Sequence, residues 1–206
     1  MRNDRLGKYL SYILRHEPER IDMKLDENGW INFQDMISGI NRVEKFKIKK
    51  EDVEREVVED EKGRFEISKD GKYIRCVQGH KAGLTNLKFK TVNEKEEVPD
   101  FLFHGTKESV LNSIMEQGIN KGTRDYVHLT ENQKIATENG ERWKEKKVLL
   151  IKIDTKKMIE DGFVFLKSNN DVWLVESVPS KYFINTNMLN NKKEKKRLKN
   201  IWFLNY

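Results

Sequence analysis

The sequence predicts an α+β protein made of two lobes, because its two halves have different patterns of apolar residues. The first half shows mainly helical spacing and a single pair of strands in residues 64–76. Residues 91–100, TVNEKEEVPD, are charged and contain a proline, so they are predicted to form a linker. Short apolar segments typical of strands follow. We therefore expect one lobe in residues 1–90, a second in 101–190, and a basic and aromatic tail in 191–206.

The first predicted helix ends near Pro18, since the residue before a proline is pushed away from helical backbone angles. Its apolar stripe has the spacing i, i+4, i+7, i+8 and consists of Leu6, Leu10, Ile13 and Leu14.

Two more helices are predicted in the first half, over Phe33–Ile40 and from about Lys50 to Val58. In the latter, Val53 and Val57 are expected to point inward and the Glu and Lys side chains outward. RFEIS and KYIRC then flank the turn KDG, a strong hairpin signal. Helices followed by a two-stranded wing suggest a winged-helix-like lobe.

In the second half, strands are predicted at FLFHGT, YVHLT, KVLLIKID, FVFLK and DVWLVESV. The segment KESVLNSIMEQG is predicted to be a helix that Gly118 caps, and further helices are expected near Ile135 and Met158. The residues of the first of these helices expected to face inward are Val110, Leu111, Ile114 and Met115.

Composition narrows the class of protein. The 206 residues carry a formal net charge of +6, which favours an anionic partner such as nucleic acid or a phosphorylated metabolite. The single cysteine, Cys76, excludes a disulfide within the chain and a cysteine-based zinc site. The start lacks an apolar signal-peptide core, and no apolar run approaches the ~20 residues of a membrane helix. We expect a soluble, cytoplasmic monomer of a reducing compartment that does not bind a membrane.

Several common catalytic motifs are missing from the sequence. No G-x-G-x-x-G follows a strand, and G-x-x-x-x-G-K-[ST] does not occur, so neither a Rossmann nor a P-loop nucleotide site is supported. H-E-x-x-H is also absent, and no set of metal ligands is visible. No metal is expected.

Histidine and arginine supply the positive signals. Each of the four histidines lies in a compact motif, LRHEP, VQGHK, FHGT or VHLT. Histidine changes protonation near neutral pH, although a hydrogen-bonded core histidine is the alternative at each position. Arginines stand at element edges in LRHEP, KGRFEIS and GTRDYVHL. The planar guanidinium binds phosphate oxygens bidentately, with surface ion pairing as the alternative.

Together these motifs resemble those of the RNA 2′-phosphotransferase family, the NAD-dependent enzymes related to tRNA splicing 2′-phosphotransferase. The segments that carry the resemblance are LSYILRHEPERIDMKLDENGWINFQDMI, KGRFEIS, IRCVQGHK, FLFHGT, RDYVHLT and VWLVESVP, in the family's order. The resemblance extends from about Leu6 to Tyr182. It implies an amino-terminal winged-helix RNA lobe and a carboxy-terminal lobe of the ADP-ribosyltransferase type.

The resemblance also implies a reaction. The RNA 2′-phosphate attacks C1 of the nicotinamide ribose of NAD⁺ and expels nicotinamide, and the neighbouring ribose hydroxyl then attacks the phosphorus. The products are RNA with a free 2′-hydroxyl and ADP-ribose 1″,2″-cyclic phosphate. NAD⁺ is consumed as a co-substrate, and the RNA partner is tRNA-like.

Site residues follow from the same resemblance. The catalytic Arg-His-Arg-Arg tetrad corresponds to Arg15, His16, Arg64 and Arg124. The residues implied to bind the substrate phosphate or RNA are Arg15, His16, Arg64, Gln78 and His80. NAD⁺ binding is implied for His104, Gly105, Thr106, His128, Thr130 and Val172, of which His104, His128 and Val172 match the ADP-ribosyltransferase triad.

Two alternatives remain open at this point: an ADP-ribosyltransferase that caps 5′-phosphate ends of RNA or DNA, and a non-catalytic RNA-binding protein. The chain also departs from the family pattern, with Lys81 in QGHK where serine is common and HLT in place of HLS. We expect Arg64→Ala and Arg124→Ala to reduce turnover strongly with the fold intact, and Lys81→Ser to matter less.

Overall fold

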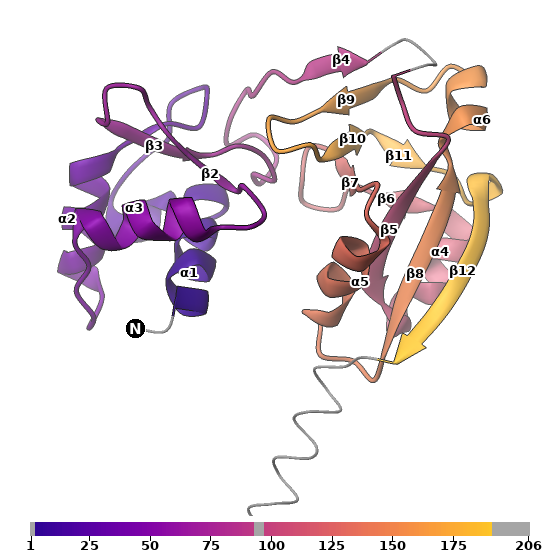
Figure 1. Ribbon diagram of the computed structural model, residues 1–206, viewed down its shortest axis with the longest axis horizontal. Coiled ribbons are helices and arrows are strands. Elements are labelled where there is room, and N and C mark those ends of the chain that lie inside the picture. The colour runs from indigo at the N-terminus through magenta and orange to yellow at the C-terminus, as the bar shows by residue number, and fades with distance from the viewer. Residues whose placement is uncertain (1–2, 93–96, 191–206) are drawn as a thin grey trace, which may run out of the picture. The chain divides into compact units, whose positions relative to one another are not determined.

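A computed structural model describes residues 3–92 and 97–190 (Figure 1). The predicted tail, 191–206, lies outside these residues, as do 93–96 of the predicted linker. The described chain is α+β with small antiparallel sheets, as predicted. It divides into two compact units. The first contains the described residues up to Phe89 together with Thr123–Asp125 and Ser168–Asn170, and the second contains the other described residues.

The first unit combines helices with one three-stranded sheet. Its elements are α1 (Asn3–Arg15), the 3₁₀ helix η1 (Pro18–Ile21), β1 (Ile31–Asn32), α2 (Phe33–Val43), α3 (Lys50–Glu59), β2 (Phe65–Ile67) and β3 (Tyr73–Cys76). The sheet is antiparallel with strand order β1-β3-β2.

Helix α1 confirms the predicted apolar stripe. Leu10, Ile13 and Leu14 are completely buried in the core of this unit, and Leu6 is nearly so. Each such side chain contributes about 1.5–3 kcal/mol relative to an exposed one. The helix ends at Arg15, and Pro18 begins η1, where the fixed backbone angle of proline suits the first helical position. The sequence around Pro18 therefore determines where α1 ends, and this end determines the positions of Arg15 and His16.

The β2–β3 hairpin is confirmed as well. Phe65 pairs with Cys76 and Ile67 with Ile74, and the turn between the strands includes Gly71 with φ of 69°. That angle is open to glycine at no steric cost, which is why the KDG sequence forms the turn.

Helix α3 corrects one prediction. Val53 is buried and Val57 is partly buried, as expected, but Glu56 was expected outside and is only 7% exposed. Its carboxylate lies 3.8 Å from Nη2 of Arg64, and a charge can be buried when a partner of opposite sign is near.

The second unit is rich in strands. Its elements are β4 (Lys90–Val92), β5 (Phe101–Lys107), η2 (Glu108–Val110), α4 (Leu111–Gln117), β6 (Ile119–Asn120), β7 (Val127–Leu129), α5 (Gln133–Glu141), β8 (Lys147–Asp154), α6 (Thr155–Glu160), β9 (Phe165–Lys167), β10 (Trp173–Val175), β11 (Ser177–Val178), η3 (Ser180–Tyr182) and β12 (Phe183–Asn190). The strand orders are β4-β9-β10-β7, β12-β8-β5 and β11-β6. The long antiparallel strands β8 and β12 run side by side (Figure 1).

Two predictions for this unit need correction. FLFHGT forms a strand as predicted, but this apolar segment is not buried throughout: Phe101 is 41% exposed and Leu102 is buried, because successive side chains of a strand point to opposite faces. Met115 was expected to face inward and is 48% exposed. It follows Ile114, the buried residue of α4, and successive helical residues diverge by about 100°. Gly118 does cap α4, where its N–H donates to the carbonyl of Ile114.

Helix α5 packs so closely on β5 that a glycine is required at the contact. A Cβ on Gly105 would lie 1.7 Å from the carbonyl oxygen of Ala136, and Gly105 is therefore needed for packing. Because backbone cannot rotate away, Gly105→Ala is expected to lower the free energy of unfolding by about 3 kcal/mol or more, at the upper end of overpacking costs. Urea denaturation measures this. The control is Gly162→Ala, where φ is 88° but no atom lies within 4 Å, with an expected loss of about 1 kcal/mol. Equal losses in the two variants would contradict the packing account.

None of the helices in the described residues is long and apolar enough to span a membrane.

Candidate functional site

Arg15 is the last residue of α1 and lies against the QGHK loop. Its carbonyl oxygen accepts a hydrogen bond of 2.8 Å from the backbone N–H of Lys81. The guanidinium faces Gly79, where a Cβ would lie 3.4 Å from Cζ. Gln78, which precedes Gly79 in the loop, is buried. Nε and Nη2 of Arg15 are buried and have no hydrogen-bond partner among the described residues. A buried donor without an acceptor is costly, so these two nitrogens suit an anionic ligand.

His80 is enclosed in the same unit. His80 is only 2% exposed, and neither of its ring nitrogens has a hydrogen-bond partner among the described residues. The ring abuts Gly29, where a Cβ would lie 3.2 Å from Nε2. Burial, followed by the charges of Arg15, His16 and Arg75, lowers the pKa of His80 to about 3. His80 is therefore neutral near pH 7 and brings no positive charge to the site.

This low pKa predicts a dependence of stability on pH. A histidine with a lowered pKa binds fewer protons in the folded state than in the unfolded state. Its contribution to stability is therefore complete above the pKa of about 6.5 that it has in the unfolded chain, and is lost as the pH falls towards about 3. Between pH 6.5 and 5 the free energy of unfolding should fall by about 1.5 kcal/mol through this group. Urea denaturation of the wild type and His80→Gln checks it, and only the wild type should show this component. Identical pH profiles would contradict it.

His16 lies immediately after α1, half-buried, with its N–H bonded to the carbonyl of Tyr12 at 2.9 Å. Burial is the main cause that lowers its pKa, followed by the charges of Arg124, Arg15 and Lys81, while Glu17 acts in the opposite direction. The ring thus lies in the field of several cations.

Arg124 belongs to the first unit through a backbone bridge. It forms an antiparallel bridge with Lys81, and the N–H of Ala82 donates to the carbonyl of Thr123 at 2.9 Å. Since Lys81 is also bonded to Arg15, the loop connects both arginine-bearing segments. The structure therefore brings Arg15, His16 and Arg124 together around one loop.

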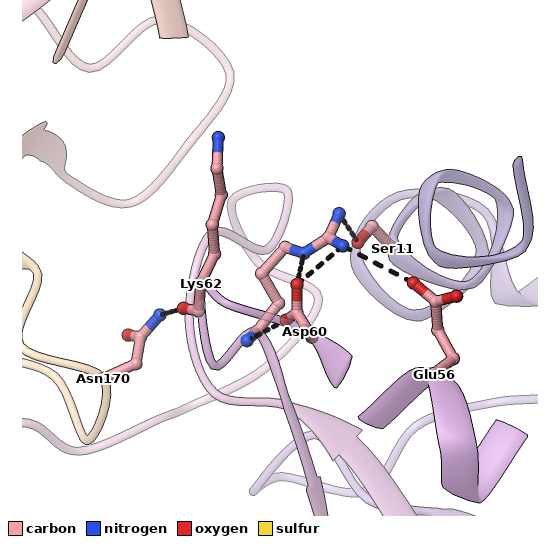
Figure 2. A network of polar contacts seen from close by, with 6 residues as sticks. Ser11, Glu56, Asp60, Lys62 and Asn170 are labelled. Carbon is pink, nitrogen blue, oxygen red and sulfur yellow. Dashed lines mark hydrogen bonds and ion pairs between the residues drawn. The ribbon is translucent and has the colours of Figure 1, made fainter. Parts of the chain in front are cut away.

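Arg64 belongs to the same unit, but carboxylates engage its guanidinium. Its partners Ser11, Glu56 and Asp60 are labelled in Figure 2. Nε and Nη2 lie 2.9 and 2.8 Å from Oδ1 of Asp60, and Nη1 donates to Ser11 Oγ at 3.3 Å. Nη2 also lies 3.8 Å from Glu56. Burial raises the pKa of the Cys76 thiol. The charge of Arg15, a side-chain hydrogen bond with Arg15 and the charge of Arg64 oppose the rise, so both arginines lie near this thiol.

Sequence reasoning missed the carboxylates that hold Arg64. Glu56, Asp60 and Arg64 are each four residues apart, and that spacing was the available signal. The loop beside them is further connected by Asn170, whose Nδ2 donates to the carbonyl of Lys62 at 2.9 Å (Figure 2).

The residues predicted to bind NAD⁺ lie in the second unit, on neighbouring strands. Nδ1 of His104 on β5 is 3.1 Å from the carbonyl oxygen of His128 on β7. Phe103 and Thr130 exchange backbone hydrogen bonds of 2.8 and 3.1 Å. The structure thus brings His104, His128 and Thr130 together.

The other three predicted residues differ in their surroundings. Gly105 and Thr106 follow His104 on β5, and Gly105 is closed off on the side of α5. Val172 is half-buried and comes directly before Trp173, which pairs with Leu129 of β7. The indole of Trp173 donates to Glu131 at 2.8 Å, a contact that the sequence did not indicate.

Among residues 3–92 and 97–190, no group of three or more His, Cys, Asp or Glu is placed to hold a metal ion.

The protein is α+β, with Arg15, His16 and Arg124 around one loop of the first unit and two histidine-bearing strands in the second. Comparisons with known proteins give the family. The model of the RNA 2'-phosphotransferase, Tpt1 / KptA family matches residues 1–177. The chain belongs to this family.

Similar curated proteins carry the same name. A "Probable RNA 2'-phosphotransferase" of Pectobacterium carotovorum is 36% identical over 181 residues, covering 88% of this chain and 94% of that protein. One of Fusobacterium nucleatum is 40% identical over 183 residues, covering 88% and 98%. Another, of Rhodopirellula baltica, is 40% identical over 176 residues, covering 85% and 92%.

Proposed function

We propose that this member of the RNA 2′-phosphotransferase family removes an internal 2′-phosphate from RNA, as at a tRNA splice junction, by transferring it to NAD⁺. The products are RNA with a 2′-hydroxyl, nicotinamide and ADP-ribose 1″,2″-cyclic phosphate. The observation that carries the proposal is the guanidinium of Arg15, whose Nε and Nη2 are buried and lack an acceptor among the described residues.

A 2′-phosphate suits this site. It is a monoester whose second pKa is near ~6, so it is mostly a dianion at neutral pH. Nε and Nη2 of Arg15 are adjacent donors and match two oxygens of one phosphate. Arg124 adds positive charge close to His16. Hydrogen bonds to charged groups contribute roughly 1.5–3 kcal/mol each, so a few of them account for firm binding.

His16 is the candidate proton donor. Its pKa is lowered by burial and by Arg124, Arg15 and Lys81. A bound dianion offsets those positive charges and raises the pKa again, because an opposite charge nearby favours the protonated ring. His16 is then able to give a proton to the RNA 2′-oxygen as that oxygen leaves the phosphorus.

Arg64 has a supporting role in this proposal. Asp60 and Glu56 neutralise much of its charge, and it holds the loop that contains Asp60 against Ser11. The side chain of Arg64 is only 22% exposed, so little of it is accessible to the phosphate.

The second unit offers residues that fit NAD⁺. A carbonyl can only accept, so Nδ1 of His104 donates to the carbonyl of His128, and this bond orients the His104 ring beside the position proposed for the ribose. The Thr130 hydroxyl accepts from the N–H of Asn132 at 3.1 Å and retains a proton to donate. NAD⁺ supplies a ribose with a good leaving group at C1 and a hydroxyl at the next carbon. With Val172, these residues would hold and orient that ribose.

Each unit also has the elements expected of one lobe. Helices α1–α3 with the β2–β3 wing support a winged-helix RNA lobe in the first unit, and the antiparallel sheets with His104 and His128 support an ADP-ribosyltransferase-like lobe in the second.

Nicotinamide release tests the proposal. The protein is incubated with NAD⁺ and an oligonucleotide that carries one internal 2′-phosphate, and the control oligonucleotide differs only in lacking that phosphate. Release that requires the 2′-phosphate supports the proposal. Release with equal rate from both, or with a 5′-phosphorylated strand alone, would instead favour ADP-ribosylation of nucleic-acid ends.

A further inference from the structure

Lys81 is the residue of the QGHK loop that the family resemblance leaves without a role, and it stands next to the candidate phosphate site. We propose that Lys81 binds a backbone phosphodiester of the RNA strand beside the 2′-phosphate, and so contributes to affinity for RNA. This inference rests on the proposed function and names a further substrate contact for it.

The backbone of Lys81 is held at two points. Its N–H donates to the carbonyl of Arg15 at 2.8 Å, and it forms an antiparallel bridge with Arg124. The adjoining residue Ala82 is bonded to Thr123 at 2.9 Å. The backbone of Lys81 is therefore held between the two segments that carry the proposed phosphate-binding arginines, and the residue is exposed.

The charge of Lys81 is available to a ligand. The residue is exposed, and its ammonium forms no ion pair or hydrogen bond with any residue in the part of the chain that the structure describes. Arg64 and Arg75 in the same unit are instead paired with Asp60 and Glu66. The positive charge of Lys81 reaches the site, because it contributes to lowering the pKa of His16.

Arg15 and Lys81 differ in burial, and this difference suits them to different phosphates of the RNA. The Arg15 nitrogens are buried, so they suit a terminal phosphate that projects from the strand and enters end-on. Lys81 is exposed and has a compact charge on a flexible stem, which suits a phosphodiester in the continuous backbone. A 2′-phosphate always lies beside such a phosphodiester in RNA. One bound nucleotide therefore offers both partners.

Salt dependence of binding measures this contact. Fluorescence anisotropy gives the Kd of wild type and Lys81→Ser for a labelled single-stranded oligonucleotide with one internal 2′-phosphate, over a series of salt concentrations. Loss of one phosphate contact lowers the slope of log affinity against log salt by about 0.7. We expect that change in Lys81→Ser, with a several-fold weaker Kd at low salt and an effect on turnover that falls mainly on KM. Lys81→Arg should restore the slope.

The matched control is Lys69→Ser, an exposed lysine in the turn between β2 and β3. It should leave the slope and KM unchanged. An unchanged slope in Lys81→Ser, or a slope change of the same size in Lys69→Ser, would overturn the inference. A fall in kcat with KM unaltered would also overturn it. Failure of the proposed function is distinct, since the wild type would then leave the 2′-phosphate in place whatever the slopes.

Discussion

Replacing Arg15 with alanine should lower kcat/KM for removal of an RNA 2′-phosphate by about 100-fold or more. The variant loses two buried donor nitrogens that have no acceptor among the described residues and that we assign to the phosphate. Two charged hydrogen bonds of roughly 1.5–3 kcal/mol each correspond to about 10²–10⁴ in rate at 1.36 kcal/mol per tenfold. Steady-state kinetics with a 2′-phosphorylated oligonucleotide and NAD⁺ provide the measurement.

The fold of Arg15→Ala should survive. Because Nε and Nη2 of Arg15 have no hydrogen-bond partner among the described residues, removing them leaves no buried acceptor unpaired. Thermal unfolding is expected to change little, which separates a loss of binding from a loss of folding. Arg15→Lys keeps the charge without the planar fork and should recover only part of the activity. Near-normal turnover in a folded Arg15→Ala would remove Arg15 from the site.

Replacing Arg64 with alanine should have its largest effect on stability. The side chain of Asp60 is 3% exposed and that of Glu56 is 9% exposed, and Nη2 of Arg64 lies 2.8 Å from Asp60 and 3.8 Å from Glu56. Removing one partner of a buried pair costs about 3–5 kcal/mol, because a buried charge remains. The sequence led us to expect an intact fold in this variant, and the observed ion pairs argue against that expectation.

Urea denaturation tests the role of Arg64, with Arg55→Ala as the control. Arg55 pairs with Asp52 at 2.6 Å, but the pair is 55% and 38% exposed, so its loss should cost less than about 1 kcal/mol. Adding Asp60→Asn to Arg64→Ala should recover part of the lost stability, since it removes the uncompensated charge. If Arg64→Ala is as stable as Arg55→Ala, the carboxylates do not depend on this arginine.

Local patterns predicted much of the fold. The stripe of α1, the break at Pro18 and the KDG hairpin depend on neighbours in the sequence, and all three are present. Strand β12 was not predicted. Its sequence FINTNMLN is rich in asparagine, which strands disfavour, and its pairing with β8 over nearly its full length determines its conformation.

The candidate site was predicted only as a set of residues. Motifs indicated Arg15, His16 and Arg124, but their proximity depends on the bridge between Lys81 and Arg124, which joins segments distant in the sequence. The partners of Arg64 show the same limit, because Ser11 is 53 residues away. Burial of a polar group depends on the tertiary fold, and no local pattern specifies it.

The mass of the products is the most direct measurement of the central claim. Wild-type protein is incubated with NAD⁺ and an RNA oligonucleotide bearing one internal 2′-phosphate, and both the RNA and the small molecules are analysed by mass spectrometry. We expect RNA lighter by one phosphate, together with nicotinamide and ADP-ribose 1″,2″-cyclic phosphate. RNA that keeps its 2′-phosphate, or that gains the mass of ADP-ribose, would contradict it.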